Sequence, residues 1–439
     1  MCGIIISSLE IPLSSIKFVK NRGPDEMNIA NHHDIHFMHF LLHLTGERTA
    51  QPVEIDGIVC IFNGEIYNYK ELLPDAKSDI YSIIDCYQKH GEEFVKYLDG
   101  EFVIVLFDFN ENKFIISADI FKTKPLFYKI NEEIVMASYE SSCKKIRDQK
   151  YEMIRPNETL VYDLENRTLL RKFKVHEFDL EQKKDSYDDF VKAFERAVLK
   201  RYPENSIPLI TLSSGLDSGA IACCLKKYGK SALYVSIPRG ENGDVINARH
   251  QSLGESHKIV DLTGEEKKKW RAYLEDQCEP FVWDWRYNNR VGVSINNGFD
   301  MGSMLGKSKI IDLSKRENSG IRVLFSGIGA DEIMARNQFY SCGWGNVDYF
   351  PEDLSTVYPW ANFFGGTMEN YLKGDEYVGG SFGYETRYPY CDRELVQEFL
   401  WLKPHLKNAY KGEIYKAPLL YYLSKECFPF HLKKMGFNV

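Results

Sequence analysis

The stretch LITLSSGLDSGAIACCL at residues 209–225 changes its pattern twice along its length. An apolar, β-forming run comes first, small and turn-forming residues follow, and apolar residues at helical spacing complete it. A strand, a tight loop and a helix N-terminus in this order favour an anion, because the first helical amides are free to donate and the helix dipole attracts negative charge. Ser213, Ser214 and Gly215 are small enough to let backbone donors approach a phosphate. The stretch therefore predicts a phosphate-binding loop.

Asp217 follows this loop closely, and a carboxylate repels a phosphate unless a cation such as Mg²⁺ lies between them. The loop is not a Walker A loop, since it lacks GK[ST]. An alternative is that its serines and aspartate only cap a helix. VLFSGIGADEI at residues 323–333 favours the phosphate site, because it is a second apolar strand that runs into a Ser/Gly loop with acids. Carboxyl ends of neighbouring parallel strands form the usual ligand crevice, so we predict that Asp217 and Asp331 share one magnesium ion.

The chain has 439 residues, which is long for one hydrophobic core, so we expect two domains. Short β-forming runs dominate the chain from Cys2 to about residue 162, and one segment of helical spacing at 79–98 interrupts them. This part predicts an α+β domain with an antiparallel sheet. After a charged linker at 176–190, strands alternate with helical segments, which is typical of a parallel sheet covered by helices. The C-terminal part has mostly helical patterning.

The composition is that of an ordinary globular protein, with 44% hydrophobic and 27% charged residues. A net charge of -8 argues against a general nucleic-acid binder. No apolar run is long enough to span a bilayer, and no basic segment typical of a signal peptide precedes the first apolar residues. The 10 cysteines show no metal-binding spacing. We therefore expect free thiols and a cytoplasmic protein.

The chain begins MCGI, which places a cysteine in the second position. Removal of Met1 would leave Cys2 with a thiol and an α-amine on one residue, and an amine with a pKa of roughly 7.7–8.0 can act as a base for its own thiol. The alternative is that a small second residue occurs by chance. Two loops rich in Gly, Asn and acids, NRGPDE at 21–26 and FNGEIYNY at 62–69, favour the nucleophile, because they offer oxyanion donors.

These motifs occur in a telling order. MCGI, RGPDE, NGEIYNY, the pair Ser78–Asp79 and KPLFY resemble the class II glutamine amidotransferase domain. SSGLDS and SGIGADE resemble the ATP-pyrophosphatase half of asparagine synthetase, and GYETRYPYCDREL, LKP and KKMGF continue the match. The resemblance covers nearly the whole chain. It implies an Ntn-hydrolase glutaminase domain, an αββα sandwich, at residues 1–180. It also implies an α/β ATP-pyrophosphatase domain, adenine nucleotide α-hydrolase-like and with a helical C-terminal part, at residues 186–439.

The resemblance assigns roles in the glutaminase half. In the family the N-terminal cysteine attacks the side-chain amide of glutamine and releases ammonia through a thioester, which implies that role for Cys2. Asn63 and Gly64 match the oxyanion and substrate contacts. Glu65 continues this glutamine-binding loop, and Asp79 matches the acid that holds the glutamine amino group.

In the synthetase half the family adenylates a carboxylate, releases pyrophosphate and lets ammonia displace AMP, so ATP and Mg²⁺ are the implied cofactors. Asp217 and Asp331 are the implied metal ligands. Lys416 falls where a family lysine stabilises the leaving pyrophosphate, and Lys411 is a weaker match. The residues that match ATP contacts, with Ser236 added, are Leu212, Ser213, Gly215, Asp217, Ser218, Ser236, Ser326 and Gly327.

Two departures from the family concern candidate site residues. Ile328 replaces a glutamate thought to help deprotonate the incoming nucleophile, and Glu385, next to Tyr384, is the nearest substitute. The arginine that binds the glutamine carboxylate is missing, and His43 is the closest match by position, with Arg48 nearby in a shifted loop. A histidine binds a carboxylate less well than a bidentate guanidinium, which predicts weak glutaminase activity. His43 as a buried structural residue is an equal alternative.

The leading hypothesis is a glutamine-dependent, ATP-consuming ligase that makes an amide, with aspartate as acceptor and asparagine as product. One alternative is the same activation of another carboxylate or amine acceptor in specialised, β-lactam-synthetase-like biosynthesis, which Ile328 and the aromatic stretch FVWDWRYNNR at 281–290 favour. A non-catalytic relative is another. The expected partners are small-molecule substrates, without nucleic acid or membrane, and a homodimer remains an option.

Overall fold

The computed structural model describes residues 2–254, 257–284, 295–335, 349–409 and 416–431. The chain divides into two compact units. The N-terminal unit comprises Met1–Glu177 together with the short segments Gln277–Glu279 and Gly379–Glu385, and the second unit comprises the rest. The predicted domain ranges 1–180 and 186–439 did not assign the segments Gln277–Glu279 and Gly379–Glu385 to the N-terminal unit. As domain limits, these two ranges stay a prediction.

Two six-stranded antiparallel sheets form the N-terminal unit within the described residues. The first has the order β10-β8-β9-β1-β3-β2 and the second the order β12-β11-β7-β6-β5-β4. The strands of the first are β1 (Gly3–Ser7), β2 (Glu26–His32), β3 (Ile35–Leu41), β8 (Phe127–Ile130), β9 (Ile134–Ala137) and β10 (Glu152–Met153). Those of the second are β4 (Val53–Ile55), β5 (Ile58–Ile66), β6 (Gly100–Asp108), β7 (Lys113–Ala118), β11 (Thr159–Asp163) and β12 (Leu169–Phe173).

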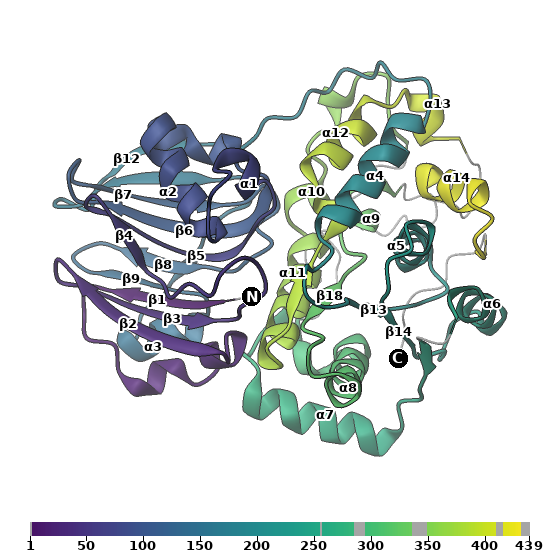
Figure 1. Ribbon diagram of the computed structural model, residues 1–439, viewed down its shortest axis with the longest axis horizontal. Helices are drawn as coiled ribbons and strands as arrows, with labels where there is room; N and C mark the ends of the chain where they lie inside the picture. Colours follow the sequence, from purple (N-terminus) through teal and green to yellow (C-terminus); the bar gives the residue numbers. More distant parts are fainter. Residues whose placement is uncertain (1, 255–256, 285–294, 336–348, 410–415, 432–439) are drawn as a thin grey trace. The chain divides into compact units, whose positions relative to one another are not determined.

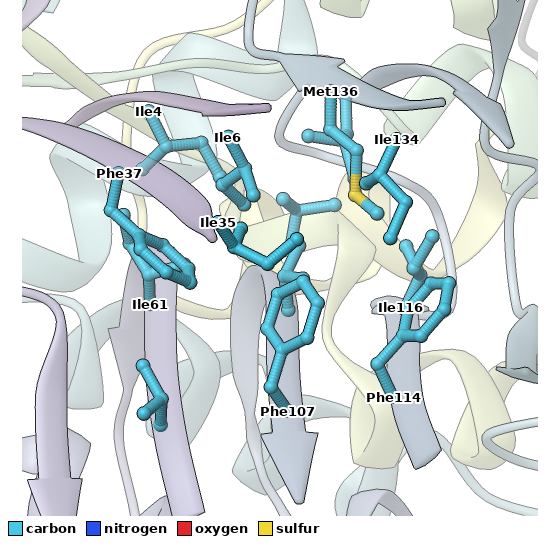
Figure 2. Packing of buried hydrophobic residues seen from close by; sticks show 14 of the residues in the cluster. Ile4, Ile6, Ile35, Phe37, Ile61, Phe107, Phe114, Ile116, Ile134 and Met136 are labelled. Carbon is cyan, nitrogen blue, oxygen red and sulfur yellow. The ribbon is translucent and has the colours of Figure 1, made fainter. Parts of the chain in front are cut away.

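The two sheets face each other across a hydrophobic core (Figure 2). Ile4 and Ile6 of β1 point into this layer from one sheet, and Val59 and Ile61 of β5 point into it from the other. Alternate residues of a strand face the same side, so β1 and β5 each dedicate one face to the core. The central strand β6 is buried on both faces almost throughout.

Helices cover the outer faces of both sheets (Figure 1). The short α1 (Tyr69–Leu72) and α2 (Asp79–His90) lie over the sheet that holds β5, and α3 (Glu140–Ile146) lies over the sheet that holds β9. The unit is thus the predicted αββα sandwich. The helix predicted at 79–98 is shorter, because Gly91 adopts a φ of +59° and ends it; a 3₁₀ turn, Gly91–Tyr97, follows.

The second unit contains a five-stranded sheet of order β15-β14-β13-β18-β19. The pairs β13–β14, β13–β18 and β14–β15 are parallel, as the alternation of strands and helices predicts. Helices α5 and α8 pack against β13, on opposite faces of the sheet (Figure 1). The strands are β13 (Leu209–Thr211), β14 (Leu233–Ser236), β15 (His257–Ile259), β18 (Val323–Phe325) and β19 (Glu385–Arg387), and a separate ladder joins β16 (Val282–Asp284) to β17 (Ile295–Asn297).

The helices of this unit confirm the α/β class with a mostly helical C-terminal part. They are α4 (Asp188–Lys200), α5 (Leu216–Lys227), α6 (Gly243–Leu253), α7 (Gly264–Gln277), α8 (Gly302–Glu317), α9 (Ala330–Met334), α10 (Ala361–Phe364), α11 (Thr367–Ser381), α12 (Arg393–Trp401), α13 (Pro404–Lys407) and α14 (Ala417–Lys425). Among the described residues, no helix is both long and apolar enough to cross a membrane.

The order of the parallel strands fixes where a ligand can bind. The chain runs outward from β13 through β14 to β15 and then returns to place β18 on the other side of β13. Such a reversal opens a crevice beyond the carboxyl ends of the two strands at the switch point. The loop after β13 holds residues 212–215, and the loop after β18 holds residues 326–329.

Asp392 anchors the chain just after β19. Its Oδ1 accepts hydrogen bonds from the backbone amides of Glu394 and Leu395, which caps α12. Its Oδ2 lies 2.5 Å from Lys200 Nζ and 2.8 Å from Arg201 Nη1, and the carboxylate is buried. Burial raises the pKa of Asp392, but the two cations lower it more, so the net direction is well below the usual value. Asp392 therefore stabilises the fold as an anion.

We predict that Asp392→Ala lowers the free energy of unfolding by about 3–5 kcal/mol at neutral pH, because it removes the buried anion that pairs with the buried Arg201 guanidinium and with Lys200. Since the folded-state pKa is depressed, this contribution is present above the unfolded value of about 3.9 and is lost as the pH falls further. Urea unfolding at several pH values measures it. Glu394→Ala removes only an exposed pair with Arg196 and should cost below about 1 kcal/mol; an equal cost for both variants would contradict the prediction.

Candidate active sites

Cys2 lies at the start of β1, two residues before Ile4, so its side chain points toward the layer between the sheets. The thiol is buried, with Sγ 4.0 Å from the carbonyl oxygen of Leu42. Burial raises the pKa of the Cys2 thiol to about 11. A thiol with this pKa is protonated at neutral pH, so a base must take its proton before it can attack.

Arg22 holds the backbone of Cys2. The guanidinium is fully buried, its Nε donates to the carbonyl oxygen of Cys2 at 2.9 Å, and its Nη1 donates to the hydroxyl of Tyr139 at 3.1 Å. Sequence analysis interpreted NRGPDE as a loop that offers oxyanion donors and did not predict this contact of Arg22 with Cys2. No sequence pattern distinguishes a loop arginine whose guanidinium is buried and hydrogen-bonded from one that is exposed to solvent.

Asn63 lies two residues after Ile61 on β5, so its side chain also points between the sheets. It is fully buried, yet neither its Nδ2 nor its Oδ1 has a hydrogen-bond partner among the described residues. Leaving a buried amide unpaired costs about 1–3 kcal/mol, and such groups need an explanation. An amide donor held in this way suits the oxyanion of a tetrahedral intermediate.

Gly64 lets β5 and β6 approach closely beside Asn63. Its φ is +143°, and a Cβ atom there would overlap the carbonyl oxygen of Glu101 on β6. Any other residue at this position would push the strands apart. The glycine of the NGE motif therefore fixes where the Asn63 amide points.

Three carboxylates accompany these groups in the N-terminal unit. Asp79, at the start of α2, accepts a hydrogen bond from the backbone amide of Ile66 at 3.2 Å. Burial raises its pKa well above the usual value, and the negative charges of Glu65 and Glu385 raise it further. The charges of Glu385 and Glu65 also raise the pKa of Cys2. Buried acids of one sign favour a positively charged group, such as an α-ammonium.

Glu385 thus lies with Cys2 and Asp79 in the N-terminal unit, because its segment Gly379–Glu385 belongs there. Its role as a substitute for the base missing at position 328 stays a prediction. Its neighbour Tyr384 is fully buried.

The two candidates for the glutamine carboxylate already have partners. His43 is half-buried; its Nε2 lies 2.9 Å from the carbonyl oxygen of Gly46, and its backbone amide donates to Asp25 Oδ2 at 2.9 Å. Arg48 is exposed and pairs with Glu26 at 2.7 Å. Both contacts stabilise the loop after β3.

The phosphate loop of the second unit lies between β13 and α5. Ser213 N donates to Ser218 Oγ at 3.0 Å, and the hydroxyls of the two serines lie 2.8 Å apart. Gly215 is the N-cap of α5. Leu212 is buried, and Ser236 at the end of β14 donates its hydroxyl to the carbonyl oxygen of Leu212 at 2.6 Å. Ser236 therefore stabilises the loop through the backbone of Leu212.

The loops after β13 and β18 meet, as the switch point predicts. A Cβ atom at Gly327 would lie 3.0 Å from Cβ of Asp217, so the second loop packs directly on the start of α5. Gly329 has a φ of +98°, which permits the turn into α9. Tyr390 donates its hydroxyl to the carbonyl oxygen of Asp217 at 2.8 Å.

Lys416 joins the two predicted metal ligands. Its Nζ lies 2.5 Å from Asp217 Oδ1 and 3.0 Å from Asp331 Oδ1, and the side chain is buried. Burial lowers the pKa of Lys416, but the two carboxylates raise it more, so the ammonium stays charged. The structure thus brings Asp217, Asp331 and Lys416 together. Lys411 lies outside the described residues.

The two carboxylates fit a magnesium ion in part. Oxygen ligands are those that Mg²⁺ prefers, and it usually takes one or two carboxylates and completes its shell with phosphate oxygens and water. Among the described residues, no group of three or more His, Cys, Asp and Glu side chains forms a metal centre. A metal at Asp217 and Asp331 would therefore depend on a phosphate ligand.

Ser326 is buried and donates its hydroxyl to Asp375 Oδ2 at 2.7 Å. Asp375, on α11, forms an ion pair with Lys307 of α8. No motif indicated this pair. Ile328 donates its backbone amide to Ser326 Oγ at 3.3 Å, and its half-exposed apolar side chain has no proton to exchange.

Comparison with known proteins agrees with this architecture. Residues 1–174 match the glutamine amidotransferase domain family. Over most of its length the chain is related to glutamine-hydrolysing asparagine synthetases. It is 24% identical over 413 residues to the nodule asparagine synthetase of Pisum sativum, covering 89% of this chain and 66% of that protein. It is 27% identical over 392 residues to a putative asparagine synthetase of Methanocaldococcus jannaschii, covering 82% of this chain and 68% of that protein. The chain thus spans about two thirds of the length of these relatives.

We predict that Asp79→Asn stabilises the protein by about 0.5–2 kcal/mol at pH 8, because it removes a buried carboxyl group that must either ionise beside Glu65 and Glu385 or take up a proton on folding. The raised pKa of Asp79 means that wild-type stability is lost as the pH rises through the folded-state value, so the gain should shrink as the pH falls. Urea unfolding at pH 5 and pH 8 measures the difference. Asp75→Asn changes an exposed carboxylate and should stay within about 0.5 kcal/mol at both values; a gain that is the same at both pH values would refute the explanation.

Proposed function

We propose that this protein is a glutamine-dependent ATP ligase that adenylates a carboxylate and amidates it with ammonia from glutamine, with aspartate as acceptor and asparagine as product. The observation that carries the proposal is the meeting of Asp217 and Asp331 on the Lys416 ammonium, at the switch point of a parallel sheet. The names of the relatives, glutamine-hydrolysing asparagine synthetases, support the choice of substrates.

In the proposed first reaction, the sulfur of Cys2 attacks the side-chain carbonyl carbon of glutamine. The α-amine exposed by removal of Met1 takes the thiol proton and returns it to the leaving nitrogen, so ammonia departs and a thioester remains. Asn63 donates to the oxyanion, and water then hydrolyses the thioester to glutamate. Asp79 and Glu65 hold the ammonium of the substrate, which relieves their mutual repulsion.

In the proposed second reaction, an oxygen of the acceptor carboxylate attacks the α-phosphorus of ATP, and pyrophosphate leaves. Ammonia then attacks the acyl carbon of the adenylate, and AMP leaves. The loop residues Ser213, Gly215 and Ser218 bind the nucleotide from one strand, and Ser326 and Gly327 bind it from the other. Lys416 neutralises charge on the leaving pyrophosphate, and Mg²⁺ held by Asp217 and Asp331 would supply further charge compensation.

A second candidate function keeps this activation chemistry but uses a different acceptor. Ile328 favours it, because an isoleucine cannot act as a base for an incoming amine or ammonium. The aromatic stretch 281–290 is described only to residue 284; Phe281 and Trp283 are buried, and Trp283 packs edge-on against Tyr371. Buried aromatic side chains packed in this way are typical of a hydrophobic core as well as of an apolar acceptor pocket.

Exchange of labelled pyrophosphate into ATP with a panel of carboxylates tests the synthetase half. We expect exchange that depends on aspartate and Mg²⁺, because adenylation is reversible before ammonia arrives. Exchange with another acid alone would establish the second candidate. A protein that supports no exchange with any acid would be a non-catalytic relative.

We predict that Cys2→Ala abolishes glutamate release from glutamine, by about 10³-fold or more, while pyrophosphate exchange and amide formation from added ammonia persist. The thiol is the only group in the proposed first reaction that can form the thioester. Cys427→Ala removes an exposed thiol of the second unit and should change neither activity. Glutamate release that survives in Cys2→Ala would remove this residue from the mechanism.

The compartment and assembly belong to the same proposal. The nine described cysteines are free thiols, which fits a reducing, cytoplasmic compartment. A homodimer would appear as a species of twice the chain mass in sedimentation.

A further inference from the structure

The amides of the phosphate loop already have acceptors within the chain. Ser213 N and Gly215 N donate to serine hydroxyls of the same motif, at 3.0 Å and 3.1 Å. Ser214 N instead donates to Oε2 of Glu241 at 2.9 Å. Glu241 differs from the hydroxyl acceptors because it comes from the segment before α6 and accepts through a carboxylate.

Glu241 is hydrogen-bonded to the loop through one of its two carboxylate oxygens, Oε2. The Ser214 hydroxyl donates to the same Oε2, and the backbone amide of Asn242 donates back to that hydroxyl at 3.2 Å. The other oxygen, Oε1, is buried and has no hydrogen-bond partner among the described residues. Burial raises the pKa of Glu241, while the Ser214 hydrogen bonds and the charge of Arg249 oppose that shift.

Arg249 fixes the backbone carbonyls of the same loop. Its fully buried guanidinium donates from Nη1 to the carbonyl oxygens of Ser213 and Gly215, the latter at 2.8 Å, and from Nε to that of Pro429 at 2.8 Å. A Cβ atom at Gly219 would overlap Nη2, so only glycine leaves room for this side chain. The carbonyls of the loop are therefore fixed while its amides face Glu241 and the hydroxyls.

We propose that Glu241 is an intramolecular anion that occupies the Ser214 amide and sets the affinity of the loop for phosphates. The inference rests on the proposed function in taking ATP as the ligand. A phosphate oxygen that binds the Ser214 amide must displace the Glu241 carboxylate, and while the two are close they repel each other. Binding of a nucleotide is thus coupled to release of the segment before α6.

A neutral side chain of the same length makes the test sharp. The variant Glu241→Gln keeps an acceptor oxygen of the same reach but loses the charge, and hydrogen bonds to charged acceptors are roughly twice as strong as neutral ones. The variant should therefore bind ATP about tenfold more tightly than the wild type, a gain that corresponds to the loss of a stronger competitor. Glu241→Asp keeps the charge but shortens the side chain and should give a smaller gain.

The measurement is calorimetric titration of each full-length protein with ATP in the presence of Mg²⁺, and with adenosine as a probe without phosphate. Glu204→Gln is the matched control, because Glu204 is exposed and precedes β13 at the end remote from the loop. Thermal unfolding of each variant shows that the proteins are folded. We expect the gain for ATP in the position-241 variants alone, and unchanged adenosine binding.

Equal ATP affinity in wild type and Glu241→Gln would overturn the inference, as would an equal gain for adenosine. Weaker ATP binding in Glu241→Gln would also overturn it, since it would make Glu241 a ligand of the bound nucleotide or its metal. If neither protein binds ATP, the nucleotide part of the proposed function fails. Binding by the variant but not by the wild type would support full occupation of the loop by Glu241.

Discussion

The contact of one buried ammonium with two carboxylates is the constraint on which the second unit's site depends. Lys416, Asp217 and Asp331 come from three segments far apart in the chain, and the buried Lys416 ammonium would be costly without the two partly exposed carboxylates. Lys416 places one positive charge between the two carboxylates. Carboxylate oxygens also attract Mg²⁺, and a Mg²⁺ ion that brings phosphate oxygens with it would lie between these carboxylates and the loop after β13. The geometry of the strands makes this meeting possible, because β13 and β18 are neighbours only after the chain reverses direction.

The N-terminal unit buries polar groups at a cost in stability. Asn63 has an unpaired amide in the layer between two sheets, as far as the described residues show, and Asp79 is held beside other acids. Both features lower stability in the free protein, and both would be relieved by a ligand with a carbonyl oxygen at one end and an ammonium at the other. Stability sacrificed at a few positions and recovered on binding is typical of a functional site. The rest of the unit offsets the loss through the extensive core between its sheets (Figure 2).

The sequence was sufficient for the features that depend on local pattern. Alternating apolar residues indicated the strands of the sandwich, and two strand–loop motifs with small residues indicated the switch-point crevice, including the approach of Asp217 to Asp331. Contacts that depend on side chains from distant segments were beyond it. Arg22 beneath Cys2, the pair Lys307–Asp375 behind Ser326 and Glu241 on Ser214 all join residues whose types are common on surfaces. Their burial follows from tertiary packing, which no local spacing records. The helix expected to reach residue 98 stops at 90 for a related reason, since a single glycine with positive φ overrides the apolar periodicity that continues past it.

Under the proposed function, the isoleucine at position 328 connects the two reactions chemically. An adenylate is attacked by neutral ammonia, so a synthetase either carries a base at that point or receives its nitrogen already unprotonated. Ile328 cannot be that base, and the hydroxyl next to it, on Ser326, is engaged by Asp375. Cleavage of a glutamine amide by a cysteine releases nitrogen as neutral ammonia, because the leaving group takes up only the proton it needs to depart. A synthetase half without a base would therefore depend on the glutaminase half for the protonation state of its substrate as well as for its supply, and ammonium from solution would be the poorer source.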